Sequence, residues 1–157
     1  MFESPRARCS MCTHPLAGYA EQMDTRQVAD ELAIRELLAA YCHRCDDGRF
    51  SELLDLFAPG ASVVLGTATV AGHAALREFF EDRQGLPEQR GRHLTVNSVV
   101  EIDGSRARAL SDFVHIKFVD GRLMPVLAGR YRDDLVRMED GRWRFARRQV
   151  DDWAPAP

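Results

Sequence analysis

The sequence predicts an α+β protein in which a curved antiparallel sheet packs against N-terminal helices. Helix-like patterns fill the first half of the chain, whereas the chain from Arg92 onward reads as four long strand-like runs. Asp-Gly pairs at 103–104, 120–121 and 140–141 separate these runs, and this dipeptide strongly favours hairpin turns. Helices that precede an antiparallel meander are typical of the α+β class.

A long amphipathic helix is expected near the start of the chain, from about Thr25 to Cys45. Asp24 followed by Gln27 resembles an N-capping pair, whose side chains bond the free N–H groups of the first turn. Gly48 is expected to end this helix. Apolar side chains recur at steps of mostly three or four residues and form one stripe: Val28, Leu32, Leu37, Leu38 and Tyr41.

The later elements follow from turn residues and alternation. A short helix over 51–58, ended by Pro59 and Gly60, is expected to lead into two short strands. These strands, over 61–66 and 67–72, precede a third helix over 73–83 and a loop over 84–91. The four long strands are expected over 93–102, 106–118, 123–138 and 142–150, and the tail 151–157 shows no regular pattern.

Length and composition indicate one globular domain. The 157 residues suffice for a single core, which we place at 24–157 after an irregular N-terminal arm over 1–23. The chain is 45% hydrophobic and carries a net charge of −3, so its charge gives no reason to expect nucleic acid or a membrane as partner. It has no export signal or membrane-spanning run, which predicts a cytoplasmic protein with reduced cysteines.

Three residues are candidates for acid–base chemistry. Tyr41 and Asp46 close the first helix, and His93 opens the first long strand. A carboxylate and an imidazole that meet in a dry pocket can exchange a proton near neutral pH, and a phenol beside them can supply another. A metal or cofactor is not needed for such chemistry, and we expect neither.

Alternation gives the strand of His93 one polar face. His93, Thr95, Asn97 and Val99 are expected on this face, and Leu94, Val96 and Val100 on the other. The polar face lines a wet cavity or faces solvent. Asp47, beside Asp46 at the end of the helix, is expected to be solvated.

Residues of the later strands complete the candidate site. Either Ser111 or Asp112 must face inward, and Ser111 is a candidate for binding substrate. Arg148 in the last strand could hold a carboxylate or an oxyanion, with a solvated charge as the alternative. His115 is expected on a dimer surface, with a pocket position as the alternative.

Two cysteine pairs, Cys9-x-x-Cys12 and Cys42-x-x-Cys45, raise the alternative of a zinc site. The second pair, however, lies inside the predicted helix, and the gap between the pairs exceeds the usual zinc-ribbon spacing. Walker-type, G-x-G-x-x-G, G-x-S-x-G and H-E-x-x-H motifs do not occur, which disfavours nucleotide-binding, serine-hydrolase and zincin functions.

Residues 25–151 resemble the SnoaL-like branch of the NTF2-like superfamily. The resemblance rests on Tyr41-x4-Asp46, then LLDLFAPGA, ATVAGHAALREFF, RHLTVNSVVEIDGSRARALSDF and GRYRDDLVRMEDGRWRFARRQV. It implies a cone-shaped α+β barrel with a deep pocket that assembles as a homodimer or homotrimer. Scytalone dehydratase and bile-acid 7α-dehydratase are the functional relatives that the chain resembles. By that resemblance His93 is the base, Asp46 its orienting partner, and Tyr41 the donor to a carbonyl or departing hydroxyl.

The expected function is therefore a cofactor-independent lyase or isomerase, similar to a dehydratase. Its substrate would be a hydrophobic cyclic carbonyl compound such as a steroid or a polyketide. The alternative is a non-catalytic module of the same fold that binds a small molecule or serves for oligomerisation.

Overall fold

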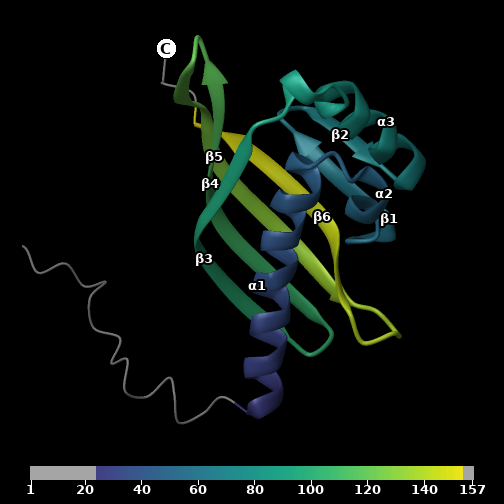
Figure 1. Ribbon diagram of the computed structural model, residues 1–157. Helices are drawn as coiled ribbons and strands as arrows, with labels where there is room; N and C mark the ends of the chain where they lie inside the picture. The colour runs from purple at the N-terminus through teal and green to yellow at the C-terminus, as the bar shows by residue number, and fades with distance from the viewer. Residues whose placement is uncertain (1–23, 154–157) are drawn as a thin grey trace, which may run out of the picture.

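The computed structural model describes residues 24–153, and the arm expected over 1–23 lies outside them (Figure 1). Helices come first and long strands follow, as the sequence predicts. The helices are α1 (Thr25–Asp46), α2 (Phe50–Leu54), α3 (His73–Gln84) and the short 3-10 helix η2 (Pro87–Gln89). The strands are β1 (Phe57–Leu65), β2 (Ala68–Ala71), β3 (Arg92–Asp103), β4 (Arg106–Val119), β5 (Arg122–Arg137) and β6 (Trp143–Asp152).

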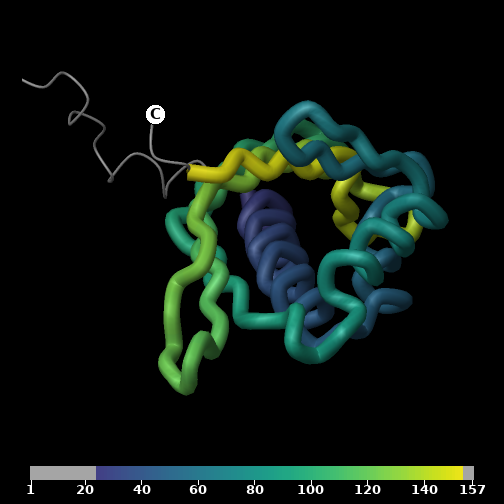
Figure 2. Tube along the Cα trace, turned by 90° about the horizontal axis from the view of Figure 1, so that it is seen from above, coloured from purple at the N-terminus to yellow at the C-terminus, as the bar shows by residue number. Residues whose placement is uncertain are grey.

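Six strands form one curved sheet in the order β2-β1-β6-β5-β4-β3, which does not close on itself. β3 to β6 form the expected antiparallel meander, and the glycine of each Asp-Gly pair has a positive φ, at Gly104, Gly121 and Gly141. β1, however, pairs with β6 in parallel, so the sheet is mixed. α1 lies in the hollow of the sheet (Figure 2). We call the end that carries the β4–β5 turn the hairpin end.

The helix predicted over 51–58 is wrong in its extent. α2 ends at Leu54, and Phe57 already belongs to β1, where it is buried against Phe145 of β6. Pro59 and Gly60 therefore lie inside a strand and do not end a helix. Pro59 fits there because the pairing of β1 with β6 is interrupted between Phe57 and Ser62, so the missing N–H breaks no ladder bond.

The capping pair at the start of α1 forms as predicted. The Arg26 N–H donates to Asp24 Oδ1 at 3.2 Å, and the Asp24 N–H donates to Gln27 Oε1 at 3.2 Å. The predicted apolar stripe is buried only in the second half of the helix. Val28 and Leu32, at 43% and 63% exposure, face solvent because they lie on the side of α1 away from the buried Asp30 and Ile34.

Asp30 ties the first half of α1 to the sheet. Its Oδ1 accepts a hydrogen bond from Trp143 Nε1 at 3.0 Å, and its Oδ2 accepts one from Arg137 Nη2 at 2.6 Å. Both partners come from the β5–β6 hairpin. Because charge-assisted bonds of this kind are short and directional, they fix the angle at which α1 crosses the sheet.

Arg148 is a core residue and not a solvated charge. Its side chain is fully buried and donates through Nε and Nη2 to the two oxygens of Asp133, at 2.8 and 2.7 Å. The guanidinium carbon also lies 3.9, 4.1 and 4.3 Å from the ring centres of Tyr41, Tyr131 and Phe145. The sheet and α1 therefore meet on a buried ion pair enclosed by aromatic rings.

Breaking this ion pair should be costly. We expect Asp133→Ala to lower the free energy of unfolding by about 3–5 kcal/mol, because it leaves the Arg148 charge buried without a partner. Urea denaturation followed by circular dichroism measures the change. The matched control is the double variant Asp133→Leu with Arg148→Met, which removes both charges and should recover most of the stability. A loss of less than 1 kcal/mol in Asp133→Ala would contradict this role (~1 kcal/mol being typical of exposed pairs).

Candidate active site

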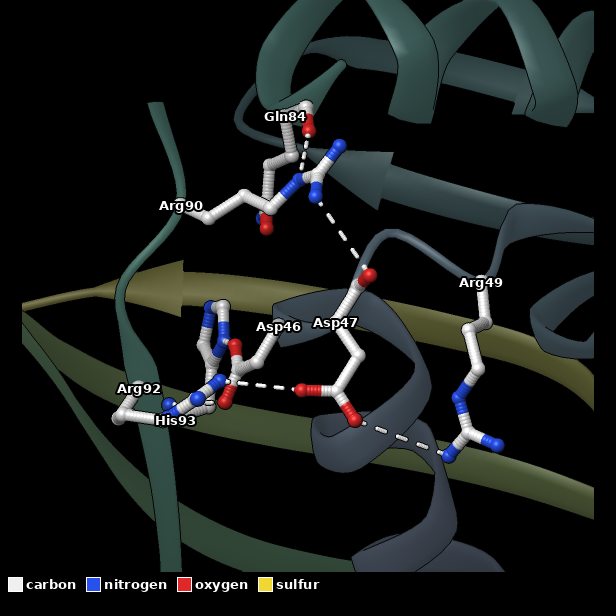
Figure 3. A network of polar contacts seen from close by, with 7 residues as sticks. All are labelled: Asp46, Asp47, Arg49, Gln84, Arg90, Arg92 and His93. Carbon is white, nitrogen blue, oxygen red and sulfur yellow. Dashed lines mark hydrogen bonds and ion pairs between the residues drawn. The ribbon is translucent and has the colours of Figure 1, made fainter. Parts of the chain in front are cut away.

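Asp46 and His93 meet at the hairpin end, where the last residue of α1 faces the start of β3 (Figure 3). His93 Nδ1 lies 2.5 Å from Asp46 Oδ1, and the backbone N–H of His93 donates to Asp46 Oδ2 at 2.8 Å. Their side chains are only 4% and 8% exposed. Because an ionised carboxylate can only accept, the proton between them sits on Nδ1 of His93, and in the neutral form of this tautomer Nε2 can take another.

Arginine side chains secure the region around this pair. Asp47 forms ion pairs with Arg92 and Arg49 at 3.2 and 3.8 Å (Figure 3), and it is exposed as expected. Arg90 donates to the backbone oxygens of Gln84 and Gly85 and, at 3.5 Å, to that of Asp47. The end of α1, the end of α3 and the start of β3 are thus held together (Figure 3).

A second imidazole stacks on the first. The rings of His93 and His115 lie 4.1 Å apart between centres, with planes 4° from parallel, and the two residues are directly paired between β3 and β4. The expectation that His115 finishes a dimer surface is therefore wrong, because its side chain is buried in the fold. Burial, then the neighbouring His93 and Lys117, lower the pKa of His115 from 6.5 to about 4. His115 is thus neutral at neutral pH.

A β-bulge in β3 changes which of its side chains face inward, compared with strict alternation along the strand. Asn97 has a φ of 54°, and the two residues Asn97 and Ser98 oppose the single residue Ser111 of β4. His93 and Thr95 share the inward face, but beyond the bulge Ser98 and Val100 face inward and Val99 is 58% exposed. The expected positions of Val99 and Val100 are therefore exchanged.

Ser111 is the inward residue of the pair at 111–112. It is buried, and its hydroxyl donates to Ser98 Oγ at 2.9 Å. Asp112 instead forms an ion pair with Arg130 at 2.7 Å, which lowers the pKa of Asp112. Ser111 thus lines the inner face of the sheet, where we had placed it as a substrate-binding candidate.

Tyr41 lies deeper than the histidine pair. Its ring is surrounded edge-on by Phe57, Phe80, Tyr131 and Phe145, at centre distances between 5.8 and 6.2 Å. Burial, with a smaller effect of Cys45, raises the pKa of Tyr41, and the nearby Arg148 opposes this shift only in part. Tyr41 is therefore a phenol that can donate a hydrogen bond. Among residues 24–153 no hydrogen bond joins it to Asp46 or His93.

Cys42 and Cys45 are free, buried thiols on the inner side of α1. Cys42 Sγ lies 3.1 Å from Thr95 Oγ1. Burial raises the pKa of both thiols, to about 12 for Cys45, so both are protonated in the metal-free fold. The other half of that zinc alternative, Cys9 and Cys12, lies outside the described residues.

Asp46, His93 and His115 are the group of described residues whose ligand atoms could surround a metal ion. One ligand atom from each lies within 4.8 Å of the others. The contact of 2.5 Å, however, joins His93 Nδ1 to Asp46 Oδ1 directly, in the geometry of a hydrogen bond. The arrangement is that of a hydrogen-bonded carboxylate and imidazole.

Two clefts lie on the surface away from Asp46 and His93. One of about 860 Å³ separates α2 and β1 from the β5–β6 turn, and one of about 650 Å³ lies over the outer face of β4 and β5. Charged side chains that pair with one another line both, such as Arg144 with Asp140 and Arg108 with Asp134. These clefts lack the buried side chains with perturbed pKa values that are typical of a catalytic site.

The fold defines the class of the protein, an NTF2-like α+β domain. An NTF2-like protein with a cystatin-like fold from Novosphingobium aromaticivorans is similar at a TM-score of 0.78 and 24% identity, covering 92% of this chain and 94% of its own. Residues 26–149 match the model of the SnoaL-like domain, and the chain belongs to this family. No curated protein matches the chain.

Two further solved structures are similar. Rv3472 of Mycobacterium tuberculosis, a protein of unknown function, has a TM-score of 0.78 at 26% identity, covering 83% of this chain and 76% of its own. A candidate scytalone dehydratase from Novosphingobium aromaticivorans has a TM-score of 0.70 at 22% identity, covering 81% and 86%. None of the helices within residues 24–153 is both long and apolar enough to cross a membrane.

The lowered pKa of His115 should make the protein less stable in mild acid. The unfolded chain takes up a proton at His115 near pH 6.5, whereas the folded protein does so near pH 4. The resulting stability is complete above pH 6.5 and is lost as the pH falls towards 4. Urea denaturation at several pH values should show this slope in wild type and a shallower one in His115→Phe. NMR titration of His115 near pH 6.5 would contradict it.

Proposed function

We propose that the protein is a cofactor-independent acid–base lyase or isomerase, similar to a dehydratase, that acts on a hydrophobic cyclic carbonyl compound. The observation that carries the proposal is the double hydrogen bond between Asp46 and His93. His93 Nε2 removes a proton next to the carbonyl group of the substrate. Asp46 holds the ring and stabilises the imidazolium that forms, as the third member of a catalytic triad does.

The surrounding residues support this division of roles. His115 is neutral, so it does not add a positive charge that would make His93 a weaker base. Tyr41 is held as a protonated phenol and is the donor for a developing enolate or a departing oxygen. Ser111 and Arg148 are the candidates for holding the substrate, and Arg148 Nη1 is a buried donor without a partner among residues 24–153.

The similar structures are consistent with the proposal but do not decide it. One is a candidate scytalone dehydratase and another is a candidate aromatic ring hydroxylase, which shares 29% identity with this chain at a TM-score of 0.70. Members of one fold carry out unrelated reactions, so the reaction is inferred from the residues of the site.

His93→Ala should remove the base and leave the fold intact. We expect turnover to fall by about 100- to 10,000-fold, the usual contribution of a general base. The substrates are a panel of cyclic β-hydroxy ketones. Product formation is measured by mass spectrometry as the loss of one water molecule from the substrate. His43→Ala is the matched control, because His43 lies on the exposed side of the same helix that carries Asp46.

A wild-type rate in the His93→Ala protein would refute the proposed mechanism. The absence of turnover in wild type, together with tight retention of an unchanged ligand, would favour the binding module instead. Circular dichroism of both variants shows whether a lost rate reflects a lost fold.

We further propose that the protein forms a homodimer or homotrimer through the outer face of its sheet. Leu94, Val96 and Val99 of β3 are 48%, 45% and 58% exposed, and apolar patches of this kind mark contact surfaces. Light scattering after size exclusion should give two or three times the mass of 17.7 kDa. Val96→Glu should lower the measured mass towards that of a single chain. A monomeric wild type would contradict this assembly.

A further inference from the structure

Lys117 is the single lysine of a chain that has 20 arginines, and it lies beside the histidine pair. A Cβ placed on Gly91 would lie 2.4 Å from His115 Nε2 and 2.8 Å from Lys117 Cγ, so both side chains converge over that glycine. Lys117 also follows His115 by two residues in β4, which puts it on the same face.

The ammonium group of Lys117 has no counter-charge within residues 24–153. Asp46 is bound by His93, Asp47 by Arg92 and Arg49, and Asp112 by Arg130. No ion pair of the described chain includes Lys117, although the protein as a whole is acidic. Lys117 is half-buried, and its unpaired positive charge lies next to the candidate base, where it is available to a ligand.

Apolar side chains flank Lys117 on the same face of the β4–β5 hairpin. Leu127 is paired with His115 and Met124 with Lys117, so both share the face that carries the histidine. Val119 follows by alternation. These three side chains are between 40% and 45% exposed, on a hairpin that projects beyond the rest of the sheet (Figure 1, Figure 2). Arg122 is paired with Val119 and shares this face at the tip of the hairpin, whereas Lys117 is the cation beside the histidine pair. An apolar wall with such cations is suited to an amphiphilic anion.

We propose that Lys117 binds an anionic group of the substrate, whose apolar body lies along Leu127, Met124 and Val119. The substrate class is thereby narrowed to apolar ring compounds that carry a carboxylate or a similar anion. This inference rests on the proposed function for its choice of site, but it concerns binding alone and is tested without turnover.

The test compares two probes that differ only in charge, naphthalene-2-carboxylate and naphthalene-2-carboxamide. Isothermal titration calorimetry of the full chain should show tighter binding of the carboxylate by about fivefold, the value of one partly exposed ion pair. Lys117→Gln should abolish this preference, whereas Lys117→Arg should keep it. Arg108→Gln is the matched control, because Arg108 lies exposed on the outer face of the same strand.

A second measurement needs no substitution. Because Lys117 is the only lysine, acetylation by an N-hydroxysuccinimide ester labels one side chain besides the N-terminal amine. The carboxylate probe should slow this labelling more than the carboxamide does, and 0.5 M sodium chloride should weaken the difference. The same result in His93→Ala would show that binding is independent of the base.

Three outcomes would overturn the inference. These are equal binding of the two probes by wild type, no binding of the carboxylate, and a preference that persists in Lys117→Gln. The failure of the proposed reaction is a separate result, since it would leave the charge preference and the labelling unchanged.

Discussion

The two hydrogen bonds that His93 donates to Asp46 are the constraint on which the site depends. One uses the ring nitrogen and the other the backbone, so a single carboxylate fixes both the strand and the orientation of its side chain. The contact joins residues 47 apart in the sequence and ties the last turn of α1 to the edge strand β3. The fold thereby fixes both the orientation of the His93 ring and the nitrogen that carries its proton.

That contact is precise because α1 is held along its length. Asp30 binds Trp143 and Arg137 near one end, and the ion pair of Arg148 with Asp133 lies against Tyr41, five residues before Asp46. The cost of burying these charges is offset by complete pairing of Asp133 and by the aromatic rings around Arg148. Rigid support of this kind is what a catalytic pair needs, since small displacements lower rates steeply.

The features that were predictable from sequence are local ones. The capping pair at Asp24 and the hairpins at the three Asp-Gly pairs depend on neighbours within a few residues. The boundary between α2 and β1 depends instead on Phe57 packing against Phe145, which no local pattern records. The closeness of Asp46 and His93 was foreseen through the family resemblance and not through periodicity.

The expectation of a dimer-surface position for His115 was wrong for a related reason. If β3 and β4 paired without a bulge, the register at the β3–β4 turn would place His115 opposite Leu94. The bulge at Asn97 shifts this register by one residue, so His115 lies opposite His93. The solvated alternative for Arg148 was wrong because its partner Asp133 lies 15 residues earlier, on a different strand. Both cases need the register of the sheet, which a single sequence does not contain.

The bulge at Asn97 has a consequence for how relatives of this protein should be compared. The inward residues are odd-numbered before it and even-numbered after it, as with Thr95 and Val100. An ungapped alignment to a relative that lacks the extra residue would match lining positions with solvent positions along half of the strand. Substitution patterns inferred from such an alignment would assign the inward residues to the wrong face of the sheet. Homologues are therefore best superposed on backbone geometry before their sequences are matched.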